Sequence, residues 1–155
     1  MQGVITIQIT KQTEHIYRMT LPYKDIFTTV YVVETPAGTV LFDAASFDSD
    51  ATEYILPMLA ELGVSPNELK YIFISHNHRD HAGALGALLN EFSGACVVSR
   101  SEALREKHAD YAFVYPEDGD KLLEVLQVVT IPGHTPDSMA LLDTRTHTLI
   151  SGDCL

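Results

Sequence analysis

The chain has 155 residues, of which 46% are hydrophobic and 20% are charged, and its formal net charge is −11 at pH 7. This length suits one domain with its own core, and the acidic excess disfavours nucleic acid as a partner because the phosphate backbone is also negative. No apolar run approaches the roughly 20 residues that span a bilayer, and the first ten residues do not resemble a secretion signal. We therefore expect a single domain over residues 1–155, located in the cytoplasm and with no membrane partner.

The first third of the chain is predicted to be rich in β-strands. Apolar residues alternate with polar ones, or occur in β-branched runs, in four segments, which is typical of strands. The residues between the first two segments and between the last two have the composition of turns. The expected strands are residues 3–10, 15–20, 28–35 and 39–45.

A helix is predicted over residues 48–63, because leucine and isoleucine recur there at helical spacing. Ser49 or Asp50 is the expected cap, and Gly63 is the expected stop. Pro57 lies inside the pattern, so it should either kink the helix or mark a later start.

The rest of the chain alternates strands with helices. The segment 71–75 is short and almost entirely apolar, which indicates a strand buried on both faces. A helix should follow, beginning at or just after Asp80 and continuing to residue 92. Such alternation favours an α/β layered fold with sites at strand ends. The further expected elements are a strand at 95–100, a helix at 101–108, a strand reaching 131, and a closing hairpin of 139–143 and 147–153.

The sequence "HNHRDH", directly after the buried strand, places three histidines and an aspartate within six positions. Neutral imidazoles and carboxylates are good ligands for a borderline ion such as zinc. His76 and His78 can point to one side of an extended loop, and Asp80 and His81 can turn back from the helix start. The alternative is that Asp80 only caps the helix while the histidines are solvated. The density of the motif favours metal binding.

Two later residues are candidate ligands from other strand ends. A catalytic zinc usually takes three protein ligands and leaves one position for water, so the motif needs a distant partner. His134 follows a predicted strand and a Pro-Gly turn, and Asp153 follows the last predicted strand. His134 alone would read as an ordinary loop histidine, but together with the motif it is predicted to be a ligand.

The segments "SHNHRDH", "PGHTPDS" and "SGDCL", in that order, resemble the metallo-β-lactamase superfamily, and "LFDAAS" resembles its early aspartate motif. The resemblance covers about residues 28–155. It implies an αββα sandwich with a two-metal site at the sheet edge. It also implies that His76, His78 and His134 hold one metal, that Asp80 and His81 hold the second, that Asp153 bridges the two, and that Asp43 orients ligands.

The function that this resemblance implies is a metal-dependent hydrolase, similar to glyoxalase II, that acts on a small ester, thioester or related substrate. Zinc is the expected metal, with iron or manganese as alternatives. A metal-bound hydroxide would attack the substrate, and Asp80 would orient it. Two other readings stay open: a mononuclear-iron enzyme that resembles persulfide dioxygenases, and a catalytically inert binding module that zinc stabilises. Tyr23 and Phe27 would either form a flap beside the site or simply pack.

The sequence departs from the family pattern in two places. Asp137 stands where the family typically has glycine. The sequence also stops two residues after Asp153, whereas the family's last metal ligand is a histidine well downstream. We therefore expect the sandwich to be present mainly as its first half and the start of its second. The chain is then either a fragment or is completed by another chain, for example in a homodimer.

Overall fold

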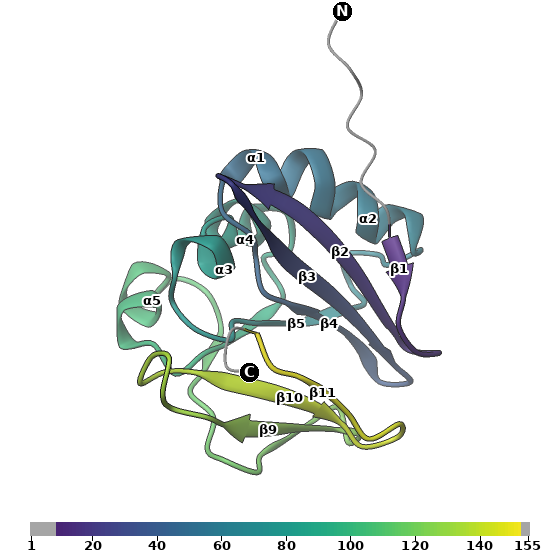
Figure 1. Ribbon diagram of the computed structural model, residues 1–155, viewed down its shortest axis with the longest axis vertical. Coiled ribbons are helices and arrows are strands. Elements are labelled where there is room, and N and C mark those ends of the chain that lie inside the picture. The colour runs from purple at the N-terminus through teal and green to yellow at the C-terminus, as the bar shows by residue number, and fades with distance from the viewer. Residues whose placement is uncertain (1–8, 153–155) are drawn as a thin grey trace, which may run out of the picture.

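The computed structural model describes residues 9–152. Within that range it contains two β-sheets and a series of short helical segments (Figure 1). The first part of the opening strand, the candidate ligand Asp153 and Cys154 lie outside the described residues. Among the residues that are described, no helix has the length and apolar composition needed to cross a lipid bilayer.

The first sheet combines an antiparallel meander with a parallel half. The meander consists of β1 (Ile9–Lys11), β2 (Ile16–Tyr23), β3 (Ile26–Thr35) and β4 (Gly38–Phe42). The parallel half, which starts from β4, consists of β5 (Leu69–Phe73), β6 (Cys96–Val98) and β7 (Phe113–Val114). The four predicted strands are confirmed, with β1 described from Ile9 onward, and each of the two predicted turns joins an antiparallel pair. The strands β2 and β3 extend further than predicted, because a two-residue turn, in which Lys24 has a φ of 52°, joins them.

The second sheet is antiparallel and follows the first in the sequence. Its strands lie in the order β11-β10-β9-β8. The predicted closing hairpin is confirmed, since β10 pairs with β11. The strand predicted to reach residue 131 is also present, ending at residue 130. The strands are β8 (Lys121–Leu122), β9 (Leu126–Thr130), β10 (Met139–Asp143) and β11 (Thr148–Ile150).

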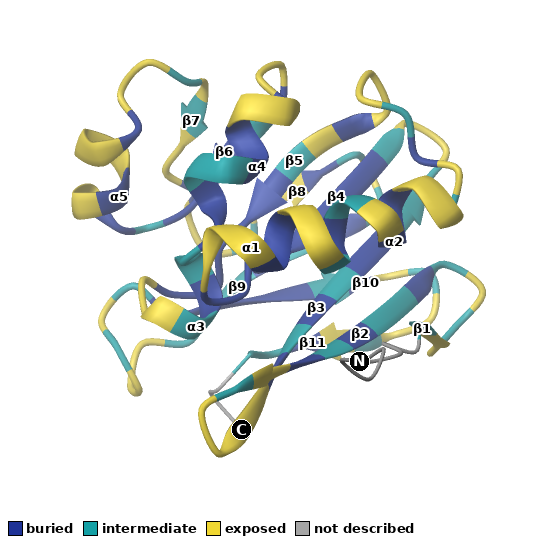
Figure 2. Cartoon of the chain, turned by 90° about the horizontal axis from the view of Figure 1, so that it is seen from above, coloured by how far each residue is buried: buried dark blue, intermediate teal, exposed yellow. Residues whose placement is uncertain are grey.

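The two faces of the first sheet support two different cores, because side chains alternate along each strand. Leu41 and Ile72 lie in a cluster with apolar residues of the helices. Their neighbours Phe42 and Phe73 lie in a cluster with the second sheet, and their rings stack at 5.1 Å between centroids. The helices accordingly expose one side and bury the other over the strands (Figure 2).

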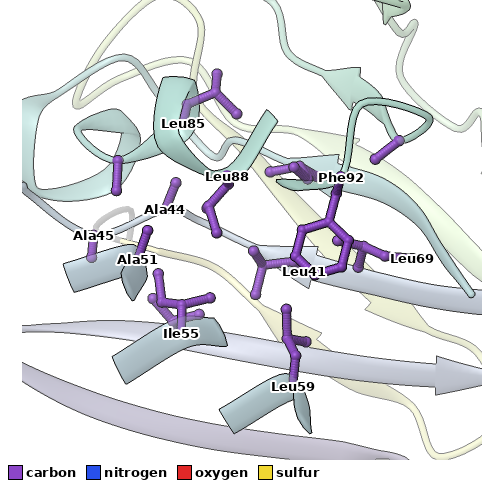
Figure 3. Packing of buried hydrophobic residues seen from close by; sticks show 14 of the residues in the cluster. Leu41, Ala44, Ala45, Ala51, Ile55, Leu59, Leu69, Leu85, Leu88 and Phe92 are labelled. Carbon is purple, nitrogen blue, oxygen red and sulfur yellow. The ribbon is translucent and has the colours of Figure 1, made fainter. Parts of the chain in front are cut away.

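The helical segment after β4 begins at Asp48, and a second helix starts within it at Leu56, one residue before Pro57. It consists of α1 (Asp48–Asp50), a π-helical turn (Ala51–Ile55) and α2 (Leu56–Glu61), and Pro57 falls in the first turn of α2, where a missing N–H is tolerated. The expected cap was wrong by a few residues. The N-cap is Phe47, and the Asp50 carboxylate accepts the backbone N–H groups of Ser46 and Phe47. Ala51, Ile55 and Leu59 face the core beside Leu41 (Figure 3).

The helix predicted after the histidine motif is broken into two. These are α3 (Arg79–Ala82) and α4 (Leu85–Glu91), and they differ from one continuous helix because Gly83 and Ala84 donate their N–H groups to Ala45 and Ala44. A Cβ at Gly83 would lie 1.9 Å from the carbonyl oxygen of Ser46, so the close approach requires glycine. The last helix, α5 (Glu102–Lys107), is confirmed, with Ser101 as its cap.

The observed architecture is a layer of helices, the first sheet and the second sheet. Over residues 9–152, the buried apolar side chains of the helices belong to the first core cluster. The α/β layered fold is therefore confirmed, and the described chain forms three layers of the expected four-layer sandwich.

Candidate metal centre

The candidate ligands lie where strands end. The strands β4 and β5 run parallel, with Phe42 opposite Phe73, so the residues that follow them emerge at the same edge of the sheet. The N–H of Asp43 donates to the carbonyl oxygen of Phe73 at 2.7 Å, which continues this pairing for one more residue. The loop between β9 and β10 reaches the same edge from the second sheet, since the N–H of Met139 donates to the carbonyl oxygen of Ser75 at 2.9 Å.

Three imidazoles meet at this edge. Each of His76, His78 and His134 offers one ligand atom, and these atoms all lie within 4.8 Å of one another. Nε2 of His134 lies 3.2 Å from Nδ1 of His78. For comparison, two nitrogens bound tetrahedrally to one zinc at its usual bond length would be about 3.3 Å apart. The separation of these two nitrogens therefore fits a shared metal ion.

Hydrogen bonds set the tautomer of His76. The hydroxyl of Ser75 donates its one proton to Oδ2 of Asp43 at 2.9 Å, and Nδ1 of His76 lies 3.0 Å from the same hydroxyl oxygen. With Asp43 ionised, Nδ1 must carry the proton of the His76 ring and donate it to Ser75. The lone pair of the ring is then on Nε2, as a metal ligand needs. His76 is fully buried, so this orientation is held by packing as well.

The same carboxylate holds His81. Oδ2 of Asp43 lies 2.6 Å from Nδ1 of His81; with Asp43 ionised, Nδ1 is the donor and the lone pair of the ring is on Nε2. Nε2 lies 3.4 Å from Oδ2 of Asp80. An imidazole lone pair and a carboxylate oxygen at this distance attract a cation, either a proton or a metal.

Asp43 is the buried centre of these contacts. It is 1% exposed, and its carboxylate also accepts the N–H of Ser75 at 2.8 Å. Burial raises the pKa of the Asp43 carboxyl, and the hydrogen bonds from His81 and Ser75 oppose that rise. Its backbone φ of 68° turns the chain sharply under α3, a conformation that aspartate adopts more readily than most residues.

The first turn of α3 is anchored from both sides. The hydroxyl of Thr28, on β3, donates to the carbonyl oxygen of Asp80 at 2.5 Å. The N–H of Ala44 donates to the carbonyl oxygen of His81 at 2.7 Å. The backbone that carries Asp80 and His81 is therefore fixed to the first sheet.

The structure brings together His76, His78 and His134 as one group, and Asp80 with His81 as a second. Asp43 contacts His81, as an orienting residue should, while Asp153 lies outside the described range. Sequence reasoning gave no role to Ser75, although the quoted motif begins with it. It also missed the carboxylate of Asp137, which accepts the N–H of Asn77 at 2.8 Å. The one available signal was that aspartate replaces a glycine there.

Comparison with known proteins agrees with this geometry. The model of the metallo-beta-lactamase superfamily matches residues 23–155. A beta-lactamase-like protein 2 homolog from Caenorhabditis elegans is 29% identical over 132 residues, which cover 83% of this chain and 44% of that protein. A hydroxyacylglutathione hydrolase from Thermosynechococcus vestitus is 34% identical over a region that covers 72% of this chain and 44% of that protein. An N-acyl homoserine lactonase from a Bacillus species is 28% identical over a region that covers 72% of this chain and 56% of that protein.

Solved structures share the fold. A flavo di-iron protein mutant from Thermotoga maritima superimposes with a TM-score of 0.73 at 20% identity, covering 88% of this chain and 40% of that one. A metallo-beta-lactamase mutant from Cronobacter sakazakii superimposes with a TM-score of 0.70 at 24% identity, covering 93% of this chain and 62% of that one. The chain thus spans about half the length of the curated relatives it matches.

Proposed function

Because the chain belongs to the metallo-beta-lactamase superfamily, we propose that it forms part of a metal-dependent hydrolase that acts on a small ester, thioester or related substrate. The observation that carries this proposal is the cluster of His76, His78 and His134, with ligand atoms within 4.8 Å. Three imidazoles are a common ligand set of catalytic zinc, so zinc is the metal we propose.

In this proposal, His76, His78 and His134 hold a first ion, and Asp80 and His81, together with Asp153, hold a second. A bound ion would lower the pKa of water and polarise the carbonyl group under attack.

The chain's own residues prepare the site for this chemistry. Asp43 and Ser75 fix His76 and His81 in the tautomers that present Nε2 to the site, so no proton has to be removed from those atoms. The carboxylate of Asp80 would accept a hydrogen bond from the attacking water and orient it. Thr28 and α3 hold the backbone of Asp80, which limits how far that carboxylate can move.

Two observations support a small acyl substrate. The names of two relatives, an N-acyl homoserine lactonase and a hydroxyacylglutathione hydrolase, denote hydrolysis at an acyl carbonyl. A cavity of about 240 Å³ lies beside His78, between α3 and α5, and Arg79 and Lys107 also line it. This volume is smaller than the roughly 300 to 1,000 Å³ of typical ligand pockets, so it suits one end of a small molecule.

The test combines metal analysis with a substrate screen on the whole protein. We expect zinc to co-purify and thioesters, lactones or aryl esters to be hydrolysed. His78→Ala should abolish both zinc binding and hydrolysis, because it removes one of the three imidazoles. The variant should still fold, since His78 is exposed and its loss removes little packing. The matched control is His15→Ala, on the loop between β1 and β2, which should change neither.

The alternatives predict other results. Iron in place of zinc, with consumption of oxygen on a persulfide and no hydrolysis, would support the persulfide-dioxygenase-like enzyme. Zinc that stabilises the fold without turnover of any ester, thioester or lactone would support the inert binding module. Either result would contradict the proposed hydrolase.

A further inference from the structure

Two loops from different sheets supply the three imidazoles. The first ligand loop, residues 75–78, follows β5 and carries His76 and His78. The second ligand loop, residues 131–138, joins β9 to β10 and carries His134. The position of His134 relative to the other two imidazoles therefore depends on contacts between these loops.

The second ligand loop is held by its own hydrogen bonds. The N–H of Thr135 donates to the hydroxyl of Ser138 at 3.2 Å, and the two hydroxyls lie 2.6 Å apart. The N–H of Ile131 donates to the carbonyl oxygen of Ser138 at 3.0 Å, which closes the base of the loop. A contact at one end of this loop can therefore position His134 at its middle.

Besides the contact between His134 and His78, two hydrogen bonds connect this loop and the start of β10 to the first ligand loop. One is the backbone bond from Met139 to Ser75. The other is the bond from the N–H of Asn77 to Oδ2 of Asp137, at 2.8 Å. Asn77 lies between His76 and His78 in the sequence, so the carboxylate of Asp137 holds the peptide that joins those two candidate ligands.

We propose that Asp137 is a positioning residue, which sets the distance of His134 from His76 and His78 by accepting the N–H of Asn77. The bond joins the peptide between His76 and His78 to a residue three positions after His134, and Nε2 of His134 lies 3.2 Å from Nδ1 of His78. A glycine at position 137 would have no side chain to make this bond. The inference rests on the metal site of the proposed function.

Two variants separate the hydrogen bond from the charge of Asp137. Asp137→Asn keeps an acceptor oxygen for the N–H of Asn77 and removes the negative charge. Asp137→Ala removes both. The matched control is Asp120→Ala, because Asp120 accepts the N–H of Glu117 at 2.9 Å within a single turn that contains no candidate ligand.

The experiment measures zinc affinity by competition with a chromophoric chelator, and the visible absorption of the cobalt-substituted protein. We expect Asp137→Ala to weaken zinc binding by about tenfold and to change the cobalt spectrum, since supporting residues of this kind contribute on that scale. Asp137→Asn should keep the cobalt spectrum and an affinity within about threefold of the parent, and Asp120→Ala should match the parent in both.

Two results would overturn the inference. If Asp137→Ala binds zinc as the parent does, the bond does not position the ligands. If Asp137→Asn is as weak as Asp137→Ala, charge and not the hydrogen bond is responsible. Should the parent bind no zinc, the proposed function fails separately. The rate of hydrogen exchange at the Asn77 amide then tests the hydrogen bond to Asp137 without metal. Faster exchange in Asp137→Ala, but not in Asp137→Asn, supports the bond. Equal exchange in the parent, Asp137→Asn and Asp137→Ala contradicts it.

Discussion

The two ligand loops reach the same site in different ways. The first ligand loop stands on a buried frame, since Asp43 is 1% exposed, His76 is fully buried and His81 is 3% exposed. The second ligand loop is open to solvent, and His134 is exposed. Buried carboxylate and hydroxyl groups hold the first, whereas the second is held at its base by the buried hydroxyl of Ser138 and through Asp137 by a hydrogen bond at an exposed site.

Because of this difference, variants in the two regions should affect folding stability and metal affinity to different extents. A change in the buried frame leaves polar groups without partners inside the protein, so it should cost folding free energy as well as affinity. A change in the exposed part of the second ligand loop leaves polar groups that water can reach, so it should mainly cost affinity.

Asp43→Ala should have the largest effect. It removes the acceptor of three donors, the N–H and hydroxyl of Ser75 and Nδ1 of His81, all of which are buried. We expect a loss of about 3 to 5 kcal/mol in the free energy of unfolding, measured by urea denaturation without metal. Asp118→Ala, which removes an acceptor of the Thr130 N–H at an exposed site, should cost far less. Equal losses in the two variants would remove the distinction between the regions.

Gly83→Ala tests the close backbone contact between Gly83, at the end of α3, and Ser46. Its Cβ would lie 1.9 Å from the carbonyl oxygen of Ser46, so backbone must shift, and we expect a loss of about 2 to 3 kcal/mol. Gly94→Ala is the control, because a Cβ there meets nothing within 4 Å, and it should change the free energy by less than about 0.5 kcal/mol. A Gly83→Ala protein as stable as Gly94→Ala would show that α3 is not locked to the chain after β4.

Of the three variants, Ser138→Ala should have the smallest effect on stability. It removes the hydroxyl that accepts the N–H of Thr135 and contacts its side chain. The expected loss is about 1 kcal/mol, with zinc affinity lower by about three- to tenfold. Thr146→Ala breaks a similar hydroxyl pair with Thr148 in the distant β10–β11 turn. That variant should bind zinc as the parent does, and a matching loss of affinity would contradict a local role for Ser138.

Much of the fold was readable from local pattern. The main strands were predicted because β-branched and alternating runs are long and bounded by turns, and the ligand motif was placed correctly at a strand end. The turn between β2 and β3 was missed because Lys24 adopts a positive φ without the usual glycine or asparagine. The strands β7 and β8 have two residues each, too few to show a period.

The rest depends on contacts between distant segments. The break between α3 and α4 follows from the approach of Gly83 to Ser46, which helical periodicity does not reveal. The bonds from Ser75 to Asp43 and from Asn77 to Asp137 span 32 and 60 residues of sequence. Residue types suggested ligands, but only the fold shows which side chains hold them.

The most direct test of the central claim, that His76, His78 and His134 share a metal ion, is zinc content measured together with thermal stability in the whole protein. We predict at least about one zinc per chain after extensive dialysis, given the three-imidazole set, and a lower melting temperature after chelation. His78→Ala should lose both the zinc and the response to the chelator. A dialysed protein that contains no transition metal and melts at the same temperature with and without chelator would contradict the claim.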